Sequence, residues 1–301
     1  MSRRGWVLFA TMSVIWGIPY LMIKVAVEEL APSTLVLLRC GIATVLLLPI
    51  ALFRGQIRPL LPRWKPLLFY TAVEICGPWL LLGFAEQRLS SSLTGLLIAG
   101  VPLVGALLAR FGPARERLGG RRLTGLLVGV AGVGALVGFE AGAGDARAIV
   151  AVALTVLGYA LGPAILSRSL ADLPSLGVVA ASLAIAAVVY LPAGILEAPH
   201  AWPSARVTLA VLGLAVICTA VAFLVFFQLI AEVGPARSTV ITYVNPAVAV
   251  LLGVLILDEA FTAATAVGFV LILAGSVLAT SRKAPVEPAV ALAPEAARTA
   301  P

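Results

Sequence analysis

Charged side chains are scarce in this sequence. Only 12% of the 301 residues are charged, while 61% are hydrophobic; a soluble domain carries about 25% charged residues. A water-soluble core cannot accommodate so much apolar surface, so the composition excludes an ordinary soluble domain and predicts a protein in a lipid bilayer. In that setting the net charge of +7 reflects where the basic turns lie, and we expect no nucleic-acid partner.

Residues that carry enzyme chemistry are equally rare. The one histidine, His200, lies in a proline-flanked loop, and the three cysteines, Cys40, Cys76 and Cys218, lie inside apolar runs. We therefore predict no disulfide, no metal site and no cofactor. The sequence has no G-x-x-x-x-G-K-[ST] phosphate loop, no H-E-x-x-H and no G-x-S-x-G, so we expect neither direct ATP hydrolysis nor an enzyme.

What is abundant is apolar runs of about 20 residues, each long enough to cross a ~30 Å hydrocarbon core. The predicted spans are 6–26, 34–53, 65–85, 92–111, 123–140, 147–166, 176–196, 206–229, 237–257 and 262–281. The first has no small-residue cleavage pattern before Lys24, so we interpret it as an uncleaved helix. The predicted fold class is an all-α integral membrane protein, followed by a disordered cytoplasmic tail at 282–301.

A series of landmarks occurs twice along the chain. Pro102, Glu116, Gly125 and Gly132 fall 14, 9 and 7 residues apart, and Pro246, Glu259, Gly268 and Gly275 fall 13, 9 and 7 apart. Pro19 and Pro163 each precede their later proline by 83 residues. The pattern indicates a duplication into 1–140 and 141–281, with five spans each. Because five is odd, the second repeat is inverted, as in many secondary transporters.

The basic residues predict the orientation. Most of the 21 lie in turns on the side of the N-terminus, whereas the opposite side receives only Arg88, Arg147 and Arg206. Cytoplasmic turns carry the excess of Lys and Arg in membrane proteins. Both termini are therefore predicted to be cytoplasmic, in a multi-pass protein of the cell (inner) membrane.

Two runs of residues carry a resemblance to a known family. The first half has Trp16-Gly17, Lys24 and Arg39; the second has Pro246, Leu257-Asp258-Glu259, Gly268 and Gly275. They resemble the W-G…K…R and P…L-G-E…G…G runs of the drug/metabolite transporter superfamily, in its ten-span EamA-type branch, with Asp258 replacing the usual glycine. The resemblance covers nearly residues 5 to 281.

That resemblance implies a secondary active transporter that exports small metabolites such as amino acids. It would work by alternating access, as a monomer or homodimer, with proton coupling left open and a cavity lined by spans 1, 3, 4, 6, 8 and 9. The alternatives are an intramembrane lipid-modifying enzyme or a non-transporting scaffold. Saturable, gradient-dependent flux would separate the first from both.

Three charged residues inside the spans are the sharpest candidates for substrate binding or coupling. Glu74 lies mid-span, where a charge costs about 2.5–3.5 kcal/mol; it could contact a substrate ammonium, carry a proton, pair structurally with Arg39, or be neutral and hydrogen-bonded between helices. Arg39 could hold a substrate carboxylate or lock its helix to a neighbour. Lys24 could share the site or extend to the interface.

Prolines, aromatic residues and glycines complete the candidates. The prolines inside spans, which predict helix kinks and cavity-lining carbonyls, are Pro19, Pro78, Pro102, Pro163 and Pro246. The further candidates for lining a pocket are Trp16, Tyr20, Trp79, Tyr159, Tyr243 and Asn245. Glu116 and Glu259 are interpreted as helix-capping acids. The pairs Gly125/Gly129, Gly134/Gly138 and Gly158/Gly162 predict close helix packing.

Overall fold

The computed structural model describes residues 1–111, 119–140 and 146–280. Within them it has ten helical spans long and apolar enough to cross a membrane, and no strand. The spans are Arg3–Ala26, Pro32–Phe53, Arg58–Glu86, Ser91–Arg110, Gly120–Gly138, Ala146–Ser169, Ser175–Leu196, Ala205–Val233, Val240–Leu257 and Ala263–Thr280. The predicted fold class is confirmed. The predicted tail and Glu116 lie outside the described residues, and the cytoplasmic placement of the termini stays a prediction.

Some spans are single α-helices and others are helices in series. The single ones are α3 (Pro32–Phe53), α8 (Gly120–Glu140), α9 (Ala146–Ser169), α10 (Ser175–Leu196) and α15 (Ala263–Thr280). The others are built from α1 (Arg3–Ile15), α2 (Pro19–Ala26), α4 (Trp64–Thr71), α5 (Gly77–Glu86), α6 (Ser91–Ile98), α7 (Val101–Phe111), α11 (Ala205–Leu212), α12 (Ala222–Val233), α13 (Pro235–Ser238) and α14 (Asn245–Leu257). Two π-helices, Ala72–Cys76 and Gly213–Val221, and two 3₁₀-helices, Arg58–Arg63 and Thr239–Tyr243, connect some of these pieces.

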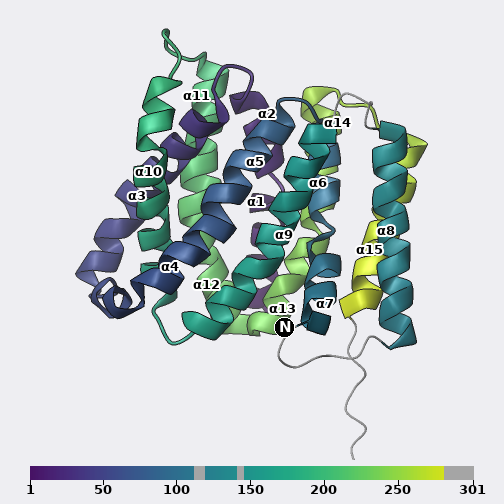
Figure 1. The fold of residues 1–301 in the computed structure, drawn as a ribbon, viewed down its shortest axis with the longest axis horizontal. Helices are drawn as coiled ribbons and strands as arrows, with labels where there is room; N and C mark the ends of the chain where they lie inside the picture. Colours follow the sequence, from purple (N-terminus) through teal and green to yellow (C-terminus); the bar gives the residue numbers. More distant parts are fainter. Residues whose placement is uncertain (112–118, 141–145, 281–301) are drawn as a thin grey trace, which may run out of the picture.

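Two pairs of helices form opposite edges of the bundle (Figure 1). At one edge α3 packs along α10; at the other, α8 packs along α15. The α8–α15 contact is a backbone contact, because a Cβ at Gly275 would lie 2.4 Å from Gly129 N and one at Gly125 would lie 2.4 Å from Ala279 N. A Cβ at Gly134 or Gly138 would meet nothing within 4 Å. Of the two predicted packing pairs in α8, only Gly125/Gly129 therefore packs closely.

The remaining six spans lie between these edges and carry the irregularities of the fold. Gly132 and Gly275 are 143 residues apart, and residues 72–76 advanced by 143 become 215–219, inside the second π-helix. The α6–α7 interruption at Ala99–Gly100 stands three and two residues before Pro102, as Tyr243 and Val244, at the start of α14, stand before Pro246. Spans 3 and 8, and spans 4 and 9, are thus irregular at equivalent places, as expected of two related halves.

Apolar side chains cover the outside of the bundle as well as its core. Val45, Leu255 and Val188 are 73%, 68% and 70% exposed. Large apolar side chains on many faces, rather than in one patch, indicate a surface that contacts lipid.

Candidate functional site

The centre of the bundle holds a buried arginine. Arg39, from α3, is 8% exposed, and its Cζ lies 3.5 Å from the ring centroid of Trp79 in α5. Its Nε donates to Thr219 Oγ1 in the second π-helix at 2.9 Å. A desolvated cation–π contact contributes about 2 kcal/mol. Arg39 therefore joins a helix of the first half to the second half without using a carboxylate.

Two tyrosines lie beside this arginine. Tyr159 in α9 lies within electrostatic range of Arg39, Glu74 and Glu86, and Tyr20 in α2 lies within range of Arg39 and Glu86. These aromatic candidates, together with Trp79, are thus brought together around Arg39. The arrangement gives one guanidinium several aromatic and hydroxyl neighbours from both halves.

Glu74 lies within the π-helix Ala72–Cys76 and faces α9 of the second half. A Cβ at Gly162 would lie 1.7 Å from Glu74 Oε2 and 2.7 Å from its Cδ, so the missing side chain of Gly162 leaves the space that the carboxyl occupies. Glu74 Oε2 is buried and has no hydrogen-bond partner. In the described residues Glu74 forms no ion pair with Arg39, which was one of the alternatives for its role. Side-chain ion pairs there join Arg63 to Asp172 and Arg206 to Glu28.

Asn245 connects the interruption in span 9 to the end of α1. With its amide oriented so that Nδ2 faces two carbonyls, Nδ2 donates to Ile241 O at 2.9 Å and to Ser13 O at 3.1 Å. Gly17, in the break between α1 and α2, lies against Val248, with Asn245 O 2.9 Å from where a Cβ would be. Asn245 thus supplies donors to backbone carbonyls that interrupted helices leave unpaired.

At the end of the bundle that the charge rule predicts to face outward, Lys24 binds backbone carbonyls. Its Nζ donates to Glu86 O at 2.7 Å and to Leu89 O at 2.8 Å, at the C-terminal end of α5. A cation at this position is favoured because a helix C-terminus carries partial negative charge. Lys24 thus caps the C-terminal end of α5, and its part in substrate binding stays a prediction.

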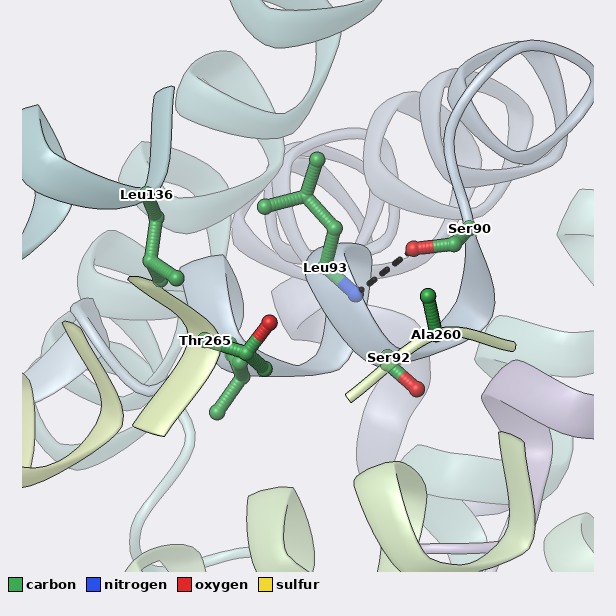
Figure 2. Close-up of a pocket in the computed structure, with 7 residues that line it drawn as sticks. Ser90, Ser92, Leu93, Leu136, Ala260 and Thr265 are labelled. Atoms are coloured by element: carbon green, nitrogen blue, oxygen red, sulfur yellow. Dashed lines mark hydrogen bonds between the residues drawn. The ribbon is translucent and has the colours of Figure 1, made fainter. Parts of the chain in front are cut away.

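Glu259 caps a helix of the other half at the same end. Its carboxylate accepts from Ser91 N at 2.7 Å and from Ser92 N at 2.9 Å, in the first turn of α6. The turn that places it has Asp258 at φ +53°, the left-handed region that favours glycine. A cavity of about 10 Å³, near the lower limit for one water molecule, lies beside Ser90, Ser92 and Thr265 (Figure 2).

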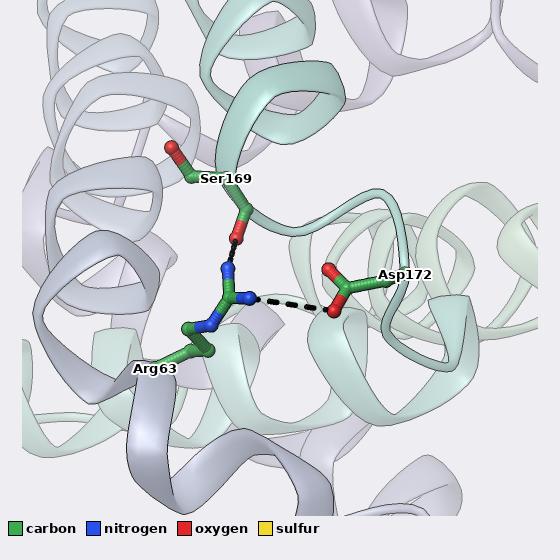
Figure 3. Close-up of polar contacts among 3 residues, drawn as sticks. All are labelled: Arg63, Ser169 and Asp172. Carbon is green, nitrogen blue, oxygen red and sulfur yellow. Dashed lines mark hydrogen bonds and ion pairs between the residues drawn. The ribbon is translucent and has the colours of Figure 1, made fainter.

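At the opposite end, Arg63 joins the two halves (Figure 3). Its Nη1 donates to Ser169 O at 2.9 Å, and its Nη2 lies 3.5 Å from Asp172 Oδ2. Tyr243 lies away from the central group, because its hydroxyl bonds Thr280 Oγ1 at 2.8 Å. Trp16 packs on Phe226 with ring centroids 4.6 Å apart.

The prolines fall into two groups. Pro19, Pro78, Pro102 and Pro246 each stand at the first or second position of an α-helix, directly after an interruption of their span. Pro163 lies inside α9, which continues through it. Proline is well tolerated in the first turn of a helix, where its missing N–H would have no partner.

Two residues of the site are not identified by the sequence prediction. Glu86 lies one residue beyond the predicted end of span 3, at 65–85. Thr219 carries no motif, and Gly162 is predicted only as one of a pair of packing glycines; the pairing of helices reveals their partners, Arg39 and Glu74. A signal existed for Glu86 alone: it is a second acid in an otherwise apolar segment.

Comparison with known proteins gives consistent results. The sequence profile of the EamA-like transporter family matches residues 3–138 and 146–281. The "Uncharacterized inner membrane transporter YedA" of Escherichia coli K12 is 30% identical over 246 residues, which are 80% of this chain and 78% of YedA; the proteins of that name from strains O6:H1 and O157:H7 match equally. A crystal structure of another protein has a TM-score of 0.66 at 24% identity, covering 93% of this chain and 97% of that one. At that identity the likeness shows the fold alone.

Proposed function

This chain belongs to the EamA-like transporter family, as a multi-pass protein of the inner membrane, and on that premise we propose that it is a secondary active exporter of small metabolites such as amino acids. The units that move would be the five-span repeats 1–140 and 141–281. Export would proceed by alternating access to a site between them.

The observation that carries the proposal is a guanidinium and a carboxyl group that both lack an ion-pair partner. Arg39 contacts an aromatic ring and a hydroxyl, and Glu74 occupies the space beside Gly162; among the described residues neither forms an ion pair. Tyr159 lies within electrostatic range of both. A substrate with a carboxylate and an ammonium would supply a partner to each, the carboxylate to Arg39 and the ammonium to Glu74.

Contacts between the two halves at both ends of the bundle support alternating access. Glu259 with Ser91 and Ser92 closes one end, and Arg63 with Ser169 and Asp172 closes the other. Each set joins residues of different halves. A substrate can pass only when one set breaks while the other holds, which is the requirement for coupling transport to a gradient.

The test is uptake and exchange of labelled amino acids by the purified protein in liposomes, with and without an imposed pH gradient. Glu74→Gln and Arg39→Gln should each weaken apparent substrate affinity about 10–150-fold, the range for losing a hydrogen bond to a charged group. The controls are Glu28→Gln and Arg206→Gln, which remove an exposed ion pair. Absence of saturable flux for every compound would refute the function. Normal transport by both central variants would refute this site.

A further inference from the structure

Glu86 is the most completely buried acid in the part of the chain that the structure describes. It is 0% exposed, and neither of its carboxylate oxygens has a hydrogen-bond partner. It ends α5, next to the first turn of α6. Leaving an ionised carboxylate buried without partners is far more costly than leaving the neutral acid so.

The charged and titratable groups near Glu86 come from α2, α3, α9 and one turn of the second half. They are Lys24 and Tyr20 of α2, Arg39 of α3, Tyr159 of α9, and Glu259 from the turn between α14 and α15. Lys24 is the group best placed to neutralise Glu86, but its Nζ donates to the backbone carbonyls of Glu86 and Leu89 instead. The carboxyl therefore lies close to an ammonium that is bonded elsewhere.

The same corner holds further polar atoms without partners. Ser91 Oγ and Ser92 Oγ are buried and unbonded, although the backbone N–H groups of both residues bond Glu259. A Cβ at Gly253 would lie 2.3 Å from both Glu259 Oε2 and Ser92 Oγ, so these groups converge on one small space. The contact that closes this end of the bundle is therefore adjacent to the buried acid.

We propose that Glu86 is a proton-binding site, occupied while Glu259 caps α6 and emptied when that contact opens. On closure, hydronium from the outer solution gives its proton to a carboxylate oxygen of Glu86, where an O–H bond forms and water is released. On opening, water and the Lys24 ammonium reach the carboxyl group and its O–H bond breaks. Water takes the proton as hydronium, and the carboxylate pairs with the ammonium. A metal cation is disfavoured because it would share the corner with Lys24.

This inference deepens the proposed function, on which it rests: it adds a proton site, separate from Glu74, that controls the outer end of the bundle. It makes closure of the outer end depend on outer pH. Substrate would then bind at Arg39 and Glu74, while the proton binds at Glu86, at the C-terminal end of α5.

The experiment is an infrared titration of the full-length protein in lipid, following the carbonyl stretch of protonated carboxyl groups. The wild-type protein should show a band at neutral pH that Glu86→Gln lacks and Glu28→Gln keeps; Glu74→Gln identifies any contribution of the other buried acid. Glu86→Asp should shift the band rather than remove it, which answers the question if Glu86→Gln fails to fold. Replacing K⁺ by Na⁺ at constant pH should change nothing.

Two outcomes would overturn the inference. One is an unchanged band in both Glu86→Gln and Glu86→Asp; the other is loss of the wild-type band on adding Na⁺, which would assign the site to sodium. Because the measurement needs no substrate, it is independent of the proposed function. A protein that transports nothing can still show the band, and a transporting protein can lack it.

Discussion

The contact between Glu74 and Gly162 gives a prediction that can be worked out from the structure. In Gly162→Ala the new methyl would overlap Glu74 Oε2 and Cδ, at 1.7 and 2.7 Å, but would lie 3.1 Å from Glu74 Cβ. Overpacking a buried position costs about 1–3 kcal/mol. We expect the lower value, about 1 kcal/mol, because only the flexible end of Glu74 must move. In a Glu74→Ala background those atoms are gone, so the same substitution should cost nearly nothing.

The assay is a double-mutant cycle of thermal unfolding in detergent. A cost of 1 kcal/mol lowers Tm by about 2–4 °C in domains of 150–250 residues, and by about 2 °C or less in a longer chain such as this one. The coupling between the two sites should equal that cost. Gly134→Ala, where a Cβ meets nothing within 4 Å, is the control for adding a methyl to a membrane helix. An equal drop in Tm for Gly162→Ala in both backgrounds would show that the methyl clashes with something other than Glu74.

Two further predictions concern the edge and the outer turn. Gly125→Ala should lower Tm through a loss of about 1–3 kcal/mol, since its Cβ would meet the backbone of α15, and a Tm no lower than that of Gly134→Ala would contradict it. Two hydrogen bonds from Ser204 hold the pKa of Glu29 below its ordinary 4.5. The bond from the Ser204 hydroxyl has the larger effect and the bond from its backbone N–H the smaller. The folded state thus gains stability from Glu29 above that pH and loses it as the pH falls through the lowered pKa. The wild-type protein should be more stable than Glu29→Gln near neutral pH and lose the difference on acidification; a Tm difference that persists in acid would refute this.

The fold could be predicted largely from hydropathy, because a bilayer demands helices of one length whatever their packing. The ten spans and their all-α character follow from that constraint. Two residues show its limit: Gly125 and Gly134 each begin a pair of glycines four residues apart, yet only Gly125 packs against another helix. Which face of α8 meets α15 depends on the partner helix, and a single sequence does not display it.

The candidate residues could be found from the sequence, but most of their contacts could not. Glu74 and Arg39 stand out because a charge inside an apolar run is costly. The sequence does not predict their contacts. An Arg39 that donates to Thr219 and packs on Trp79 cannot be distinguished, from the sequence, from one that pairs with an acid. Lys24 illustrates the same point: its partners are backbone carbonyls, which carry no residue identity.

The two π-helices also determine how each span is wound. Such a segment closes its hydrogen bonds over one more residue than an α-turn, so the chain beyond it is rotated by about 100° and advanced by about 1.5 Å relative to regular winding. Trp79 and Glu86 both lie beyond Ala72–Cys76. The direction of these two side chains, toward Arg39 and Lys24, therefore depends on the one additional residue in the helical turn that holds Glu74. Deleting one residue from Ala72–Cys76 would rotate the part of the span that follows and turn Trp79 and Glu86 away from their partners.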